Sequence, residues 1–220
     1  MAADRMFHRL CQGKYGPMST EAMEILQSMQ ENNQELLTLT NTLLAVYRYE
    51  SGIQALSFTE FNLSVLINSV ISELQPLAKE KKLQLRVSGS PNDVRSSQTW
   101  MIEGVKLELR TAFMNLIGNA LKFTDQGWIK IHLIPNGNGY EIRIQDTGSG
   151  IVPQDLPHIF ERFYQGRHHR SGTGLGLNLV WQIVVAHQGR IEATSQLGEG
   201  TCFTVWLPRC QNPSDPSTES

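Results

Sequence analysis

The sequence lacks long apolar runs, an excess of positive charge and a cysteine framework. Its 220 residues contain no run of about 18 apolar residues and no apolar signal-peptide core, so we expect no membrane segment in this chain. The net charge of -2 supplies no general basic surface, so nucleic acid is not an expected partner. Cys11, Cys202 and Cys210 lack metal-ligand spacing and cannot all pair, which favours reduced thiols in a cytosolic setting.

What is present suits a globular protein of one or two domains. Hydrophobic residues make up 40% of the sequence, which is enough for a sizeable core. A long helix is expected after the turn signal Tyr15-Gly16-Pro17, with Ser19 or Thr20 as its N-cap and Glu21 complementing the helix dipole. From there to Ser51-Gly52 a spacing of three and four residues connects a seam that is apolar except at one asparagine: Ala22, Ile25, Met29, Asn32, Leu36, Leu39, Leu43 and Val46. This spacing is typical of a coiled coil of about four heptads, and an amphipathic helix packed on its own domain is the alternative.

The rest of the chain alternates between strand and helix patterns. Residues 58–63 read as a short strand, and Asn62 or Ser64 can cap a helix that continues to about Lys79. A strand at 83–87, a polar loop at 88–98 and a helix opened by Glu103 follow. Four further strands are expected, at 128–134, 140–145, 190–195 and 201–207. The run from Gln211 to Ser220 is rich in serine and proline and is predicted to be a disordered tail.

Two carboxamides and an ammonium share one face of the helix opened by Glu103. Asn115, Asn119 and Lys122 lie at positions i, i+4 and i+7, which project from the same side of a helix. A carboxamide oxygen is a hard neutral ligand that Mg²⁺ accepts beside substrate phosphates, and a lysine can act on phosphates as a point charge. The pattern therefore suits a polyphosphate and its metal, although a solvated helix face would look the same.

Three further segments follow in a fixed order. The strand at 140–145 delivers Asp146, and Gly148 and Gly150 behind it allow a flat ring to approach the backbone; an Asx turn is the structural alternative for Asp146. Phe160-Glu161-Arg162-Phe163-Tyr164 comes next. The last segment opens a helix with glycines that leave backbone N–H groups free to bind phosphate; it reads Gly172-Thr173-Gly174-Leu175-Gly176-Leu177.

In this order the four segments resemble the N, G1, F and G2 boxes of the sensor histidine kinases. The ATP-binding domain of that family shares its fold with the Hsp90, MutL and gyrase ATPases. The resemblance is close over residues 58 to 208. It implies an α/β (α+β) two-layer sandwich, with a mixed sheet and helices on one face, preceded by an α-helical, coiled-coil-like segment. It also implies ATP and Mg²⁺ as ligands and phosphoryl transfer to a histidine as the function.

The resemblance assigns roles to individual residues. Asp146 would read the adenine amino group with support from Thr201, Asn119 would hold Mg²⁺, and Asn115 and Lys122 would support the phosphates. Family members often carry arginine where this chain has a glutamine after Phe163-Tyr164, so the γ-phosphate contact would pass to an arginine further along. The complete set of expected ATP-binding residues is Asn115, Asn119, Lys122, Asp146, Gly148, Gly150, Phe160, Arg167, Arg170, Gly172, Gly174, Leu175, Gly176, Leu177 and Thr201.

The family also suggests how the chain is divided. Residues 1–56 would be part of a helical dimerisation and phosphotransfer hairpin, 57–208 the catalytic ATP-binding domain, and 209–220 the tail. The resemblance implies a homodimer through the helices, a response-regulator receiver domain as partner and a cytoplasmic location. The parent protein would be anchored by sensing and membrane segments. The family's phosphoacceptor motif, a histidine followed by an acid, an arginine and a proline, does not occur here. His8 lacks a neighbouring acid and is expected to be an exposed helix residue.

Two other classes of function stay open from the sequence. One is a protein-binding module that retains nucleotide only to control the docking of a partner. The other is an ATPase of the Hsp90 or MutL type, or an anti-sigma kinase that acts on serine. The heptad helix directly upstream favours a histidine kinase over the other enzymes, and the intact boxes argue against a module that has lost its chemistry.

Overall fold

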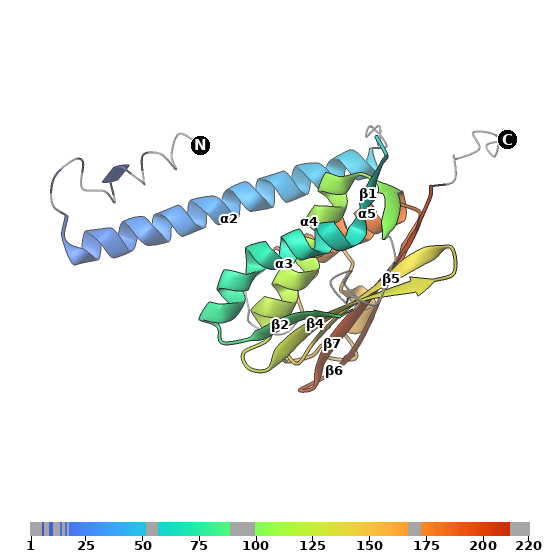
Figure 1. Cartoon of the computed structure of the whole chain (residues 1–220). Helices are drawn as coiled ribbons and strands as arrows, with labels where there is room; N and C mark the ends of the chain where they lie inside the picture. Colours follow the sequence, from blue (N-terminus) through green and yellow to red (C-terminus); the bar gives the residue numbers. More distant parts are fainter. Residues whose placement is uncertain are drawn as a thin grey trace.

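The computed structural model describes residues 18–51, 57–88, 100–166 and 173–211, together with Met6, Arg9, Leu10, Lys14 and Gly16. A long helix, α2 (Thr20–Glu50), leads to a body in which helices and a sheet form two layers (Figure 1). The predictions for His8, for residues 89–98, for Arg167, Arg170 and Gly172, and for the tail from 212 onward fall outside the described residues. The predicted boundary between residues 56 and 57 also falls partly outside them, because residues 52–56 are not described.

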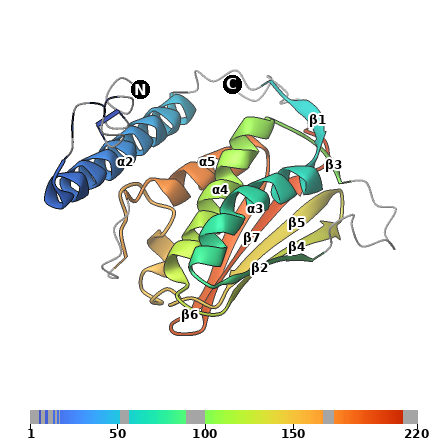
Figure 2. The same ribbon diagram turned by 60° about the vertical axis from the view of Figure 1, so that its left-hand side comes forward.

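A mixed sheet of five strands forms one layer. Its order is β2 (Gln84–Ser88), β4 (Trp128–Asn136), β5 (Gly139–Asp146), β7 (Gly200–Pro208) and β6 (Arg190–Gln196). The β2–β4 pair is parallel and the other three pairs are antiparallel. Three helices cover one face of this sheet, as Figure 2 shows: α3 (Leu63–Glu80), α4 (Lys106–Phe123) and α5 (Gly176–Ala186). The predicted fold class is confirmed.

The core lies between these helices and the inner face of the sheet. Alternate residues of β4 point inward, and Ile129 and Ile131 are fully buried, as are Ile142 and Ile144 on β5. The intervening residues of both strands face the other side of the sheet, where all of them except Gly139 are partly or fully exposed. This alternation is expected of a sheet with one covered face, and it puts Asp146, the last residue of β5, on the same side as Ile142 and Ile144.

The α2 helix begins as its sequence predicts and is packed on the body only at its end. Ser19 is the N-cap, and its side chain accepts a hydrogen bond from the Ala22 N–H at 3.2 Å. Most of the heptad seam is exposed in the single chain, for example Met29 at 50% and Leu36 at 62%. Only the last turns join the core, where Val46 is fully buried. Packing on its own domain therefore accounts for the apolar residue at the end of the seam, while most of the other seam residues stay exposed.

One predicted helix start is wrong. Residues Met101–Gly104 form a short strand, β3, which pairs antiparallel with β1 (Thr59–Asn62), and α4 begins at Lys106 rather than at Glu103. The backbone N–H of Glu103 also donates to the Arg209 carbonyl at 2.7 Å. Pairing with segments far away in the sequence fixes these residues as a strand, and no local pattern reports such pairing.

Candidate nucleotide-binding site

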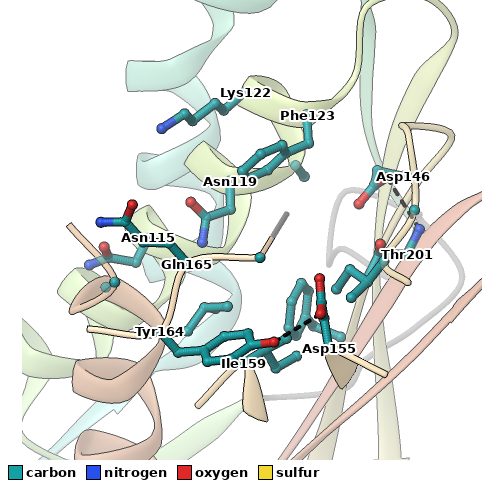
Figure 3. A pocket seen from close by; sticks show the side chains of 18 of the residues that line it. Asn115, Asn119, Lys122, Phe123, Asp146, Asp155, Ile159, Tyr164, Gln165 and Thr201 are labelled. Carbon is teal, nitrogen blue, oxygen red and sulfur yellow. Dashed lines mark hydrogen bonds between the residues drawn. The ribbon is translucent and has the colours of Figure 1, made fainter. Parts of the chain in front are cut away.

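A cavity of about 320 Å³ lies where α4, the loop after β5 and the start of α5 meet. Nine predicted site residues line it: Asn115, Asn119, Lys122, Asp146, Gly150, Gly174, Gly176, Leu177 and Thr201. Figure 3 shows Asp146 and Thr201 on one side of the cavity and Asn115 on the opposite side. Segments far apart in the sequence therefore meet around one space, with different chemistry at its two ends.

The second half of α4 supplies the polar wall at the end away from Asp146. Asn115 donates from Nδ2 to the Thr111 carbonyl at 2.9 Å, and its Oδ1 is turned toward Gly176 at the start of α5. A Cβ on Gly176 would come within 2.8 Å of that oxygen, so glycine lets the two helices approach closely. Asn119 and Lys122 line the same cavity. The shared location favours a binding role for these residues over a purely solvated face.

The first turn of α5 adds backbone donors at the same end. Its N-cap, Leu175, makes no side-chain cap hydrogen bond, so the N–H groups of the first turn keep their affinity for an anion. Gly174 has φ of +68°, and a Cβ there would lie 2.5 Å from the Phe163 backbone carbon. The Gly174 carbonyl accepts from the Phe163 N–H at 2.9 Å, which joins the F segment to the glycine turn.

Asp146 forms the opposite end of the cavity. The side chain is 5% exposed, and its Oδ1 accepts hydrogen bonds from the N–H of Gly148 at 2.8 Å and of Thr201 at 3.3 Å. Both of these bonds end on Oδ1, which leaves Oδ2 to accept from a ligand. Burial raises the pKa of Asp146, and the two N–H donors oppose that rise. The Gly148 contact has the geometry of an Asx turn. The structural interpretation of Asp146 and its binding interpretation are therefore compatible.

Three predicted residues support the cavity without lining it. Gly148 holds Asp146, and a Cβ on it would lie 2.5 Å from the Phe123 carbonyl. Phe160 packs edge-on against Phe203, with ring centroids 6.4 Å apart, and it is Phe203 that lines the cavity. Leu175 is fully buried.

The part of the cavity wall that Asp155, Ile159 and Tyr164 form was not predicted from the sequence. Tyr164 donates from its hydroxyl to Asp155 Oδ1 at 2.9 Å, and Ile159 lies beside this pair (Figure 3). Asp155 is buried, at 3% exposure. Asp155 stands outside the four segments, and only the short distance along the chain to Tyr164 hinted at their contact. Phe123, directly after Lys122, also lines the cavity, and the Nζ of Lys122 lies 5.6 Å from the centroid of its ring.

The last turn of α4 is held by a complete set of hydrogen bonds to its carbonyl groups. Thr124 donates to the Ala120 carbonyl from both N and Oγ1, at 3.1 and 2.7 Å. Lys81 Nζ donates to the carbonyls of Leu121 at 2.7 Å and Lys122 at 3.4 Å. The Ser149 N–H donates to the Phe123 carbonyl at 3.1 Å. The four terminal carbonyls thus all have partners, which fixes the turn that carries Lys122 and Phe123.

His187 holds the other end of α4. Its Nε2 accepts from the Val105 N–H at 2.9 Å, and its Nδ1 donates to the Ile183 carbonyl at 2.7 Å. The ring is fully buried, and burial lowers the pKa of His187. The neutral ring therefore joins the C-terminal end of α5 to the N-terminal end of α4, as expected for a structural residue at a helix end.

The donor chemistry fits a magnesium ion that is held together with phosphates. In the described part of the chain, no three acidic, histidine or cysteine side chains are grouped to hold a metal on their own. Asn119 lines the cavity, and its side chain carries a neutral amide oxygen of the kind that Mg²⁺ accepts as a ligand. Mg²⁺ commonly takes few protein ligands and completes its shell with phosphate oxygens and water, which matches this arrangement.

The chain is similar to known ATPases and histidine kinases. Residues 104–211 match the family model described as histidine kinase-, DNA gyrase B- and HSP90-like ATPase. The circadian input-output histidine kinase CikA of Synechococcus elongatus is 31% identical over 208 residues, which cover 92% of this chain and 27% of CikA. The phosphate regulon sensor protein PhoR of Pseudomonas aeruginosa is 32% identical over 194 residues, which cover 86% of this chain and 42% of PhoR. The chain thus spans less than half the length of these two relatives.

A solved structure supports the fold. The crystal structure of full-length ShkA in complex with AMPPNP aligns with a TM-score of 0.75 and 24% identity, over 97% of this chain and 46% of that one. At this level of identity the likeness speaks for the fold. Among the residues that the structure describes, no helix combines the length and apolar character that crossing a membrane requires.

Proposed function

Residues 104–211 belong to the family of histidine kinase-, DNA gyrase B- and HSP90-like ATPases, and we propose that this chain presents Mg·ATP to a histidine that receives the γ-phosphoryl group. The chain carries the ATP-binding catalytic region of the sensor histidine kinases, and the resemblance seen in its sequence is confirmed. One observation carries the proposal: the cavity has an acceptor carboxylate at one end and carboxamides, an ammonium and uncapped helix N–H groups at the other.

The residues would divide the nucleotide between them. Asp146 Oδ2 accepts from the exocyclic amine of adenine, and the Phe123 ring offers a surface for the base. Asn115, Lys122 and the first turn of α5 bind the phosphates, and Asn119 holds Mg²⁺, which would neutralise phosphate charge. Phosphoryl transfer of this kind depends mainly on positioning and charge neutralisation, because little covalent chemistry falls to the protein.

The acceptor histidine is expected on another polypeptide or segment. The sequence has six histidines, and none is followed by an acidic residue. The exposed apolar seam of α2 supports a homodimer through this helix, and a response-regulator receiver domain in the cytoplasm would take the phosphoryl group next.

Labelling with [γ-³²P]ATP and Mg²⁺ tests the proposal. The chain alone should stay unlabelled, whereas a separate polypeptide that carries the complete histidine helix should become labelled when the chain is added. Omission of Mg²⁺ should abolish that labelling. Acid-labile phosphate on a histidine of this chain alone would contradict the assignment of the acceptor, and an unlabelled partner that binds the chain in the presence of bound Mg·ATP would contradict the proposed transfer.

A further inference from the structure

Ser195, which does not line the cavity, connects two of the segments that build the Asp146 end of it, the loop after β5 and the start of β7. Its Oγ lies 2.7 Å from the backbone nitrogen of Ile151, 2.8 Å from the carbonyl oxygen of Gly200 and 2.9 Å from Oγ1 of Thr201. Ser195 is on β6 directly opposite Thr201 on β7, which brings the two hydroxyl groups together. Thr201 and Ile151 both line the cavity.

The hydrogens of this cluster have one consistent arrangement. A hydroxyl group has a single hydrogen and two acceptor positions. The Gly200 carbonyl can only accept, so the hydrogen of Ser195 is used in that bond. The Ile151 N–H can only donate, so it occupies one acceptor position of Ser195. The remaining short contact therefore needs the hydrogen of Thr201, which donates to Ser195.

This arrangement makes the Thr201 hydroxyl an acceptor toward the cavity. Its hydrogen is directed at Ser195, and only its lone pairs are left for a ligand. Asp146 lies beside it and receives the Thr201 backbone N–H on Oδ1, so that its other oxygen is also an acceptor. An amino group, which donates, suits two neighbouring acceptors, whereas a carbonyl oxygen placed there would be repelled by both.

We propose that Ser195 is a positioning residue: by holding the Thr201 hydroxyl as an acceptor, it makes the site favour 6-amino over 6-oxo purine nucleotides. The inference rests on the proposed function, because it assumes that the Asp146 end of the cavity receives the base of ATP. Ser195 acts through Thr201 and touches no ligand itself. Its effect should therefore appear in the choice between bases more than in overall affinity.

The test compares the affinities of the chain for ATP and for ITP, which carries an oxo group in place of the 6-amino group. Wild type should prefer ATP. In Ser195→Ala, the Thr201 hydroxyl loses its acceptor and becomes free to donate to the 6-oxo group. The preference for ATP over ITP should then fall about threefold to tenfold, the effect of about one hydrogen bond. General damage to the fold would weaken both nucleotides and leave their ratio unchanged.

Matched variants separate this role from packing. Ser195→Thr keeps the hydroxyl and should keep the wild-type preference, and Thr194→Ala, at the exposed neighbouring position of β6, should do the same. In a Thr201→Val background, Ser195→Ala should no longer change the ratio, because no Thr201 hydroxyl is left to redirect. If Ser195→Ala does not fold, Ser195→Cys, with its weaker acceptor, should lower the preference in the same direction.

The outcomes distinguish this inference from the proposed function. If wild type binds ATP and a folded Ser195→Ala keeps the wild-type ratio, the role of Ser195 is overturned and ATP binding stands. If Ser195→Ala shifts the ratio equally with and without the Thr201 hydroxyl, the route through Thr201 is overturned. If wild type binds neither nucleotide, the proposed function itself fails.

Discussion

In the proposed site, recognition of the base would depend most directly on Asp146. It is nearly buried, it closes one end of the cavity, and its Oδ1 is already occupied by two backbone donors. Those donors fix the carboxylate so that Oδ2 presents an acceptor in one direction. A flexible surface aspartate would have to lose more conformational freedom on binding, so the fixed geometry favours selective binding.

We predict that Asp146→Asn weakens ATP binding. The asparagine oxygen can still accept from Gly148 and Thr201, which turns the NH₂ group toward the amino group of adenine and places two donors against each other. Losing a hydrogen bond to a charged group costs about 1.5 to 3 kcal/mol, or about tenfold to more than a hundredfold in affinity. Titrations of ATP and GTP measure the effect, with Glu192→Gln, an exposed position on β6, as the charge control. Unchanged ATP affinity would remove Asp146 from the site.

Single residues of the site were predictable where one element or one turn contains the whole pattern. Asn115, Asn119 and Lys122 follow helix spacing, and Asp146 precedes a pair of glycines, so sequence alone identified them. Ser195 was not predictable, because its contacts with Ile151 and Thr201 depend on the pairing of β6 with β7 and on the loop that packs against them. A lone serine in a strand carries no sign of such contacts.

At the scale of elements, α4 is the part that positions the site. Lys81, Thr124 and Ser149 hold its C-terminal turn next to the cavity, and His187 holds its first turn at the far end. A helix fixed at both ends presents its side chains in a defined direction. This suits a site in which phosphates and a metal must meet several groups at once.

We predict that Lys81→Met lowers both stability and ATP affinity. The ammonium group is the partner of two terminal carbonyls of α4, and its loss should cost about 1 kcal/mol of unfolding free energy. Lys122 and Phe123 on that turn would then be less well placed. Lys81→Arg should restore much of the loss. Lys79→Met, which removes the same charge from an exposed position in the last turn of α3, the helix that Lys81 caps, should change little; if it matched Lys81→Met in thermal melting and ATP titration, a general charge effect would be the cause.

The buried His187, which joins α5 to α4, predicts that the stability of the fold depends on pH. Because burial lowers the pKa of His187 in the folded state, the unfolded chain binds the proton more readily, and acid favours unfolding. The stability due to the neutral ring should be complete above the unfolded-state pKa of about 6.5 and decline as the pH falls below it, until the folded-state pKa is reached. The raised pKa of Asp146 acts in the opposite direction, because the folded chain binds that proton more readily than the unfolded chain does.

Denaturant titrations at pH 7.5 and pH 5.5 measure this dependence. Wild type should lose more unfolding free energy on acidification than His187→Gln, by at most about 1.4 kcal/mol per pH unit. His158→Gln, which changes an exposed histidine, should behave as wild type does. Equal losses in wild type and His187→Gln would show that His187 does not contribute to acid sensitivity.

Elements with a strong local pattern were predicted well. The helices α2 and α3 each begin at one of the two caps predicted for them, because Ser19 and Asn62 satisfy N–H groups within their own first turns. The strand β3 was not predicted, since its four residues are defined by pairing with β1 and by the Arg209 carbonyl. Local chemistry thus explains the caps, and only the folded chain explains β3.

At the scale of the whole molecule, a long helix is joined to the ATP-binding body by its last turns. Val46 is buried, and Tyr49 is close to Glu108 in the first turn of α4; burial, and secondarily Glu108, raise the pKa of Tyr49. These contacts lie toward the end of α4 that His187 holds. The helix α2 extends away from the body in Figure 1, and most of its seam is exposed. The sequence predicted this helix without showing which of its turns would be covered.

The central claim is that stretches from α4, the loop after β5, the start of α5 and the start of β7 form one ATP site. Hydrogen–deuterium exchange with and without Mg·ATP tests it most directly, because it reports on each stretch separately. We predict slower exchange in residues 115–123, 146–151, 173–177 and 200–203 together, with the first half of α2 unchanged. Exchange that Mg·ATP leaves unchanged in these four stretches, or slows only in α2, would contradict the account.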